Sequence, residues 1–260
     1  MSLVRQKGKA SAETRRKRRL RFYRTRAREL RMIAKALAST KHPILAHIIP
    51  MRRCNLDCGY CNEYDDVSNP VPLDEMKRRL EILARMGTTI ITISGGEPLM
   101  QHRFVLKVFA AVKEMGVHTA LDSNGYFGDR LTDADLGSID LVLLDLKAMT
   151  PDLHRRYTGM DNQPVHDFAR RLAAARKPIW VRFVLVPGWT DDMAEVGRIA
   201  EFAASLGNVE RVDVLPFHQM GRFKWEKLGM EYKLKDTQPP SRAVTDEAIA
   251  RFRAAGLKAF

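Results

Sequence analysis

From residue 42 onward, short apolar runs alternate with segments whose apolar residues recur at helical spacing. The apolar runs predict strands, and the helical patterns predict helices, with one more short helix between the third and fourth strands. The expected strands are 44–49, 88–94, 117–122, 139–146, 179–186 and 209–215, and the expected helices are 72–86, 101–115, 151–157, 165–176, 191–206 and 245–255. Such alternation is typical of a parallel sheet with crossover helices, so we expect an α/β fold.

The first 41 residues have a different composition from the rest. Residues 1–31 contain 13 Lys or Arg and two Glu, so they carry +11 of the chain's formal charge of +13. Apolar residues between Leu20 and Leu37 lie at helical spacing, which predicts a basic amphipathic helix after a disordered start. We expect 1–41 to form a basic extension and 42–260 to form one core with a C-terminal segment. The extension suits an anionic surface, namely nucleic acid, an anionic lipid leaflet or an acidic protein; the alternative is a solvated extension whose apolar stripe docks on the core.

All three cysteines, Cys54, Cys58 and Cys61, lie within eight positions. Their odd number, their crowding and the lack of a secretory signal argue against a disulfide framework. No apolar run approaches 18 residues, so no transmembrane segment is expected. We therefore expect reduced thiols in a cytoplasmic protein.

The spacing Cys-x3-Cys-x2-Cys indicates a metal centre. Three thiolates on a short loop can each bind one iron of a 4Fe-4S cluster, which leaves the fourth iron open for a cofactor or substrate. The alternative is a zinc site whose fourth ligand is His47 or Glu63.

A second motif follows about 35 residues later, where a β-branched run ends in Gly95-Gly96-Glu97-Pro98. The two motifs, with Tyr60 just before the last cysteine, resemble those of the radical S-adenosylmethionine (radical SAM) enzymes. The resemblance implies a partial (β/α)6 TIM-type barrel. It also implies that S-adenosylmethionine binds the open iron, with Tyr60 beside it and with its amino group held by Gly95, Gly96 and Glu97.

Polar residues follow or end the other predicted strands, at the edge where barrels of this type place their chemistry. The stretch from about residue 117 to the end, including Asp140–Lys147, Val186–Asp192 and Leu215–Gly221, resembles the pyruvate formate-lyase activating enzymes. That resemblance implies that Lys147 contacts the S-adenosylmethionine carboxylate. It implies further cofactor contacts by Asp145, Arg182 and His218, and a monovalent cation at Asp122 and Ser123. The alternatives are a strand-end ion pair for Asp145 and Lys147 and a capped loop histidine for His218.

The first half departs from the activating enzymes. It lacks their Asp-Gly-Pro-Gly-Ile-Arg sequence, and after Cys61 it reads Asn-Glu-Tyr-Asp-Asp where they have His-Asn-Arg-Asp. This part resembles other radical SAM enzymes.

Together the resemblances imply an oxidoreductase of anaerobic metabolism. It would cleave S-adenosylmethionine reductively to a 5'-deoxyadenosyl radical and generate a glycyl radical on a partner such as formate acetyltransferase. A flavodoxin- or ferredoxin-type protein would donate the electron. The alternatives are a radical SAM enzyme acting on a small molecule, lipid or peptide, and a non-enzymatic, metal-stabilised protein that binds nucleic acid.

Overall fold

The computed structural model describes residues 43–61, 65 and 67–260, together with seven positions between 27 and 38. These seven positions are helical, and three of them, Leu30, Ile33 and Leu37, expose their apolar side chains. The stripe is therefore not docked on the barrel at these residues. The rest of the basic extension and Glu63 lie outside the described residues, and the boundary near residue 41 stays a prediction.

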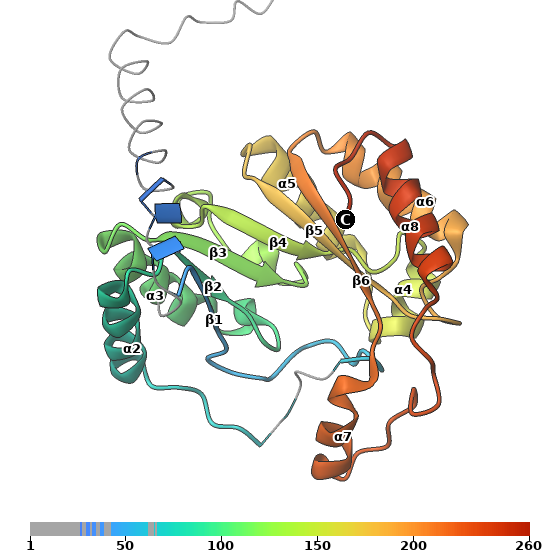
Figure 1. Cartoon of the computed structure of the whole chain (residues 1–260), viewed down its shortest axis with the longest axis horizontal. Helices are drawn as coiled ribbons and strands as arrows, with labels where there is room; N and C mark the ends of the chain where they lie inside the picture. The colour runs from blue at the N-terminus through green and yellow to red at the C-terminus, as the bar shows by residue number, and fades with distance from the viewer. Residues whose placement is uncertain are drawn as a thin grey trace, which may run out of the picture.

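Among the described residues, six parallel strands form one sheet in chain order (Figure 1). They are β1 (Leu45–Ile48), β2 (Ile90–Ile93), β3 (His118–Ser123), β4 (Leu141–Asp145), β5 (Ile179–Leu185) and β6 (Val209–Pro216). This order leaves β1 and β6 as two separate edges, so the sheet is a barrel that does not close. The predicted α/β class with six parallel strands is confirmed.

Beyond the helical positions between 27 and 38, the α-helices of the described residues lie between successive strands or after β6. They are α2 (Leu73–Met86), α3 (His102–Glu114), α4 (Pro151–Thr158), α5 (Gln163–Ala174), α6 (Met193–Ser205), α7 (Arg222–Leu228) and α8 (Arg242–Ala254). Helices α2 and α3 lie beside the first half of the sheet, and α6 and α8 pack together beside β5 and β6 (Figure 1). The core between helices and strands is apolar, with Phe109, Phe183 and Phe252 among its largest fully buried side chains.

Three elements differ from the sequence prediction. The short helix expected between β3 and β4 is a pair of 3-10 turns, Gly128–Arg130 and Asp135–Ser138, and Asp135 at the start of the second accepts hydrogen bonds from the backbone and hydroxyl of Thr132. Helix α8 begins three residues earlier than expected because the Ser241 hydroxyl caps it, accepting from the backbone N–H of Val244. Helix α7 was not predicted, since it has only seven residues and none is buried.

The C-terminus covers the edge of β6. The backbone N–H of Val212 donates to Lys258, that of Phe260 donates to Val212, and that of Val214 donates to Phe260, at 2.9–3.1 Å. These bonds satisfy backbone groups that an open sheet edge leaves unpaired. In the part of the chain that the structure describes, no helix combines the length and apolarity needed to cross a membrane.

Candidate functional site

A cavity of about 260 Å³ lies at the carboxyl ends of the strands. This volume is near the lower end of the range of roughly 300–1,000 Å³ for small-molecule sites. Twelve of the thirteen predicted site residues line it: Cys54, Cys58, Tyr60, Cys61, Gly95, Gly96, Asp122, Ser123, Asp145, Lys147, Arg182 and His218. The structure therefore brings together residues from the cysteine loop, from the ends of four strands and, with Arg182, from the middle of β5.

The loop after β1 carries the three cysteines over this edge of the sheet. Cys58 is buried, and Cys54 and Cys61 are half-buried. The loop is anchored by backbone hydrogen bonds from Asp57 to Thr158 of α4 and from Glu97 to Arg53, both 2.9 Å long. These two anchors fix the loop against opposite sides of the barrel mouth.

Gly95 and Gly96 are required where the strand end approaches the cysteine loop. Both have positive φ values, +83° and +56°, which side chains rarely tolerate. A Cβ atom on Gly96 would lie 2.1 Å from the carbonyl oxygen of Arg53. Only a glycine allows this contact between the two motifs.

Glu97 is the predicted site residue that does not line the cavity. Its carboxylate is fully buried and accepts hydrogen bonds from the backbone N–H of Leu99, the hydroxyl of Ser123 and the backbone N–H of Asn124, at 2.8–2.9 Å. Burial raises the pKa of Glu97 to about 7, although these donors act in the opposite direction. Glu97 therefore joins the end of β2 to the end of β3, and its predicted contact with a cofactor stays a prediction.

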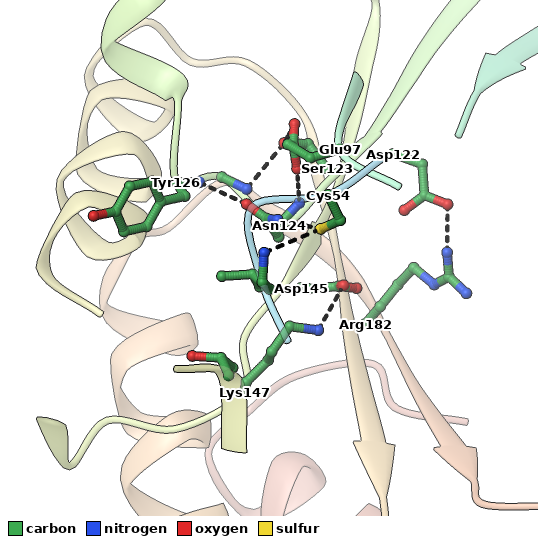
Figure 2. Close-up of polar contacts among 12 residues, drawn as sticks. Cys54, Glu97, Asp122, Ser123, Asn124, Tyr126, Asp145, Lys147 and Arg182 are labelled. Carbon is green, nitrogen blue, oxygen red and sulfur yellow. Dashed lines mark hydrogen bonds and ion pairs between the residues drawn. The ribbon is translucent and has the colours of Figure 1, made fainter. Parts of the chain in front are cut away.

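Two ion pairs cross the cavity wall (Figure 2). Lys147 Nζ lies 2.9 Å from Asp145 Oδ2, so the alternative of a strand-end ion pair describes this structure. Burial favours a neutral Lys147, yet Asp145 and other neighbours hold the pKa of this ammonium well above its usual value. Both side chains nevertheless line the cavity, where the same charges can face a ligand.

The second ion pair joins strands that are not neighbours. Arg182 of β5 donates to Asp122 Oδ2 at the end of β3, and the Ser94 hydroxyl donates to the same oxygen at 2.8 Å. Burial raises the pKa of Asp122, and the Arg182 guanidinium opposes this shift. One oxygen of the predicted cation site is thus already occupied by two donors from the chain.

The surroundings of the cysteines suit metal-bound thiolates better than free thiolates. Burial raises the pKa of Cys58 to about 12 and that of Cys54 to about 11, so the loop holds neutral thiols until a metal replaces their protons.

Two asparagines that the sequence prediction did not include support this fit. Asn124 Nδ2 donates to Cys54 Sγ at 3.6 Å and to Asn55 Oδ1 at 3.0 Å. The buried Asn55 Nδ2 has no hydrogen-bond partner among the described residues, so it leaves a donor beside the cysteines. A sulfur cluster supplies acceptors for such donors. Asn124 directly follows Asp122 and Ser123, the polar end of β3, and this polar run is the signal that marks it in the sequence.

The geometry gives the zinc alternative no fourth ligand among described residues. His47 is exposed on β1 and does not line the cavity, and Glu63 is not described. Among the described residues, no three His, Cys, Asp or Glu side chains are gathered closely enough to hold one metal ion. A cluster has a different requirement, because each cysteine binds a different iron.

Aromatic side chains pack against the cysteine loop at Gly59. The ring of Trp189 stacks on Tyr157 of α4 with centroids 6.1 Å apart, and a Cβ atom on Gly59 would lie 2.8 Å from the Trp189 ring. The sequence pattern marked the stretch that contains Trp189 but not this contact, which joins residues 130 positions apart.

Comparisons with known proteins agree with this site. The sequence profile of the radical SAM superfamily matches residues 48–200. A pyruvate formate-lyase-activating enzyme of Staphylococcus aureus is 39% identical over 242 residues, which cover 86% of this chain and 93% of the relative. The match is too long to be confined to residues after 117, so the likeness to the activating enzymes extends into the first half.

Solved structures give the same answer about the fold. A domain of pyruvate-formate lyase-activating enzyme from Bacteroides vulgatus has a TM-score of 0.55 and 28% identity, covering 65% of this chain and 96% of that one. SuiB of Streptococcus suis bound to S-adenosylmethionine has a TM-score of 0.66 and 18% identity, covering 92% of this chain and 55% of that one. The second likeness, at such low identity, concerns the fold alone.

Proposed function

Because the chain belongs to the radical SAM superfamily, we propose that it cleaves S-adenosylmethionine reductively and uses the resulting radical to generate a glycyl radical on a pyruvate formate-lyase-type partner. The observation that carries the proposal is the cavity in which three cysteines meet the polar ends of the strands. Family membership makes the chain an enzyme and overturns the alternative of a non-enzymatic nucleic-acid-binding protein.

The cysteines would hold the cluster. We assign Cys54, Cys58 and Cys61 as ligands of a 4Fe-4S cluster, with Asn55 and Asn124 donating hydrogen bonds to its sulfur atoms. When bound, such a cluster supplies the electron that splits the sulfonium of S-adenosylmethionine into methionine and a 5'-deoxyadenosyl radical. The chain shields this chemistry from water with the cysteine loop.

The strand ends would hold the cofactor. Lys147 suits the methionyl carboxylate, because it is a buried ammonium held in its charged form. Asp145, Arg182 and His218 also line the cavity and would face the nucleoside and the sulfonium. The ring of Tyr60 would lie beside the cofactor, and its centroid is 5.5 Å from Lys147 Nζ. Gly95 and Gly96 let the backbone approach the amino group, while Glu97 keeps this strand end in place. A monovalent cation beside Asp122 and Ser123 would share Asp122 with Arg182.

The partner is proposed from the relative that matches most of the chain. Its printed name is pyruvate formate-lyase-activating enzyme, and 39% identity across 93% of its length supports the same kind of substrate here. The open barrel leaves room for a segment of a partner enzyme to reach the cavity. We place the reaction in the cytoplasm, where the three free thiols stay reduced, with a flavodoxin- or ferredoxin-type protein as the electron donor.

One sequence feature favours a second candidate. The residues after Cys61 differ from those of the activating enzymes, and in that family they lie close to the cluster. About 1 Å of misplacement of a substrate can cost a hundredfold in rate. The enzyme would then act on a small molecule, a lipid or a peptide with the same cofactor chemistry.

An anaerobic mixing experiment separates the two candidates. The reconstituted enzyme is mixed with dithionite, S-adenosylmethionine and the pyruvate formate-lyase of the same genome, and the electron paramagnetic resonance spectrum is recorded. A glycyl radical doublet supports the proposal, and replacement of any one of the three cysteines by Ser should abolish it. Formation of 5'-deoxyadenosine without a glycyl signal favours the second candidate.

A further inference from the structure

The cysteine loop has a second exposed side, away from the cavity. There, a hollow lies between the loop and α7, and its lining residues are Leu56, Asp57, Cys58, Cys61, Lys224, Trp225, Leu228 and Met230. Its volume of about 10 Å³ leaves room for little more than one water molecule. The hollow is therefore too small to bind a ligand. It marks a place where little protein separates two of the cysteines from the surface.

Apolar side chains are exposed on α7 and on the residues that flank it. Helix α7 buries none of its residues and stands away from the sheet at the mouth of the barrel (Figure 1). Met220 and Phe223 are 71% and 61% exposed, and Leu228 and Met230 at the rim of the hollow are also exposed. We call the segment Met220–Lys235 the α7 surface. Grouped apolar side chains of this kind are typical of a contact site for another protein.

The α7 surface is also basic. It contains five Lys or Arg and two Glu, a formal charge of +3, whereas residues 43–260 as a whole have a formal charge of zero. Lys227 lies one turn after Lys224, so by helical spacing both lie on the side of α7 that borders the hollow. Asp57 of the cysteine loop also borders the hollow, yet the net charge of the α7 surface is positive and is complementary to an acidic protein.

We propose that the α7 surface is the docking site of an acidic one-electron carrier protein, and that the electron enters through the hollow toward Cys58 and Cys61. The inference rests on the proposed function, because it requires the 4Fe-4S cluster at these cysteines. In this step the reduced carrier loses one electron and the cluster gains it; no bond forms or breaks.

The position of the hollow argues for a carrier over the substrate enzyme. Cavity and hollow share Leu56, Cys58 and Cys61. None of the residues proposed to hold S-adenosylmethionine, such as Asp145, Lys147 and Arg182, borders the hollow. A protein docked on the α7 surface thus faces Cys58 and Cys61 across a hollow that the proposed cofactor contacts do not line. Such a place suits electron delivery, whereas a substrate glycine must reach the cofactor.

The experiment compares Lys227→Glu with the control Lys107→Glu, which makes the same charge change at an exposed position on α3. Reduced flavodoxin and reduced ferredoxin are the probes, and bleaching of the cluster absorbance is followed by stopped flow. At low ionic strength, Lys227→Glu should slow the reduction by about tenfold, within the range for electrostatic steering, and Lys107→Glu should not. The difference should shrink at 1 M salt, where the Debye length is about 3 Å.

A binding measurement provides a readout that needs no cluster. Calorimetric titration of the cluster-free protein with the same carriers should show weaker binding for Lys227→Glu than for wild type and Lys107→Glu. Equal reduction rates and equal binding for all three proteins would overturn the docking site.

Dithionite, a small reductant, separates this inference from the proposed function. With dithionite, Lys227→Glu should generate as much glycyl radical as wild type, because the carrier is bypassed. A loss of glycyl radical in this variant alone would show that the α7 surface binds the substrate enzyme, which contradicts the inference. No glycyl radical in wild type, with carrier docking intact, would instead reject the proposed function.

Discussion

At the scale of single residues, Gly96 leaves no room for a side chain against the backbone of Arg52 and Arg53. Gly96→Ala would place its Cβ atom 2.1 Å from the Arg53 carbonyl oxygen while keeping φ at +56°. Strain and overpacking together should lower the free energy of unfolding by roughly 2–4 kcal/mol, because no side chain can rotate out of the way. Urea denaturation of the variant measures this loss.

Gly116→Ala provides the matched control for that variant. Gly116 has φ at +70° but has no atoms within 4 Å of an added Cβ. Only the backbone strain remains, so the expected loss is about 1–2 kcal/mol. Equal losses for the two variants would show that the contact between Gly96 and the cysteine loop is unimportant.

The buried carboxylate of Glu97 should make the stability of the fold depend on pH. Its pKa is raised from 4.5 to about 7 in the folded chain, so between these values the folded state binds a proton that the unfolded state has lost. The free energy of unfolding should therefore fall by about 3 kcal/mol at this site as the pH rises from 4.5 to 7. The Gln side chain of Glu97→Gln has no proton to lose in this range. The urea midpoint of this variant should therefore not show the fall with rising pH that Glu97 causes in wild type.

Glu201→Gln, at an exposed position on α6, serves as the control and should follow wild type across the same pH range. If Glu97→Gln also follows wild type from pH 4.5 to 7, Glu97 does not change its protonation on unfolding in the way described.

At the scale of elements, the strands were predictable because each is a short apolar run bounded by turn residues or charges. The helices were predictable where they have an apolar stripe and an end signal, such as Gly87, whose φ of +89° closes α2. Helix α7 has neither a buried stripe nor the length to show a period. It therefore could not be found from hydrophobic spacing.

The site was predictable in its membership but not in its contacts. Polar residues at strand ends stand out in the sequence, because the hydrophobic pattern of a buried strand does not require them. Their partners come from remote strands: Arg182 reaches Asp122 across 60 positions, and Glu97 accepts from Ser123. Only the fold shows that Glu97 faces these donors and not the cavity.

The covered edge of β6 is a test at this scale. Removal of residues 258–260 deletes three backbone hydrogen bonds to Val212 and Val214 together with the buried Ala259. At roughly 0.5–1.5 kcal/mol for each bond, the loss should be about 2–4 kcal/mol. Phe260→Ala keeps the backbone bonds and should cost under about 1 kcal/mol, since it loses only the contact of Arg211 with the exposed ring. Equal urea midpoints for wild type and the truncated chain would contradict this role.

At the scale of the whole molecule, the net positive charge and the candidate site lie in different parts of the chain. Residues 1–42 carry all of the net charge of +13, whereas every residue that lines the cavity lies between Cys54 and His218. A chain that starts near Leu37 should therefore still form 5'-deoxyadenosine with dithionite at a rate close to that of the full chain. A truncated chain that folds and takes up the cluster, yet forms none, would show that the extension belongs to the site.

The central claim is that the radical made in this cavity removes a hydrogen atom from a glycine of a partner enzyme. The most direct measurement is isotope transfer, with the partner labelled with deuterium at the α-carbon of its glycines. The partner is incubated anaerobically with the reduced enzyme and S-adenosylmethionine, and the 5'-deoxyadenosine is analysed by mass spectrometry. The account predicts that the product gains one deuterium atom as the glycyl radical signal appears, and that this signal is a narrowed singlet because deuterium replaces the α-hydrogen that splits it. Unlabelled 5'-deoxyadenosine, formed at the same rate with or without the partner, would contradict it.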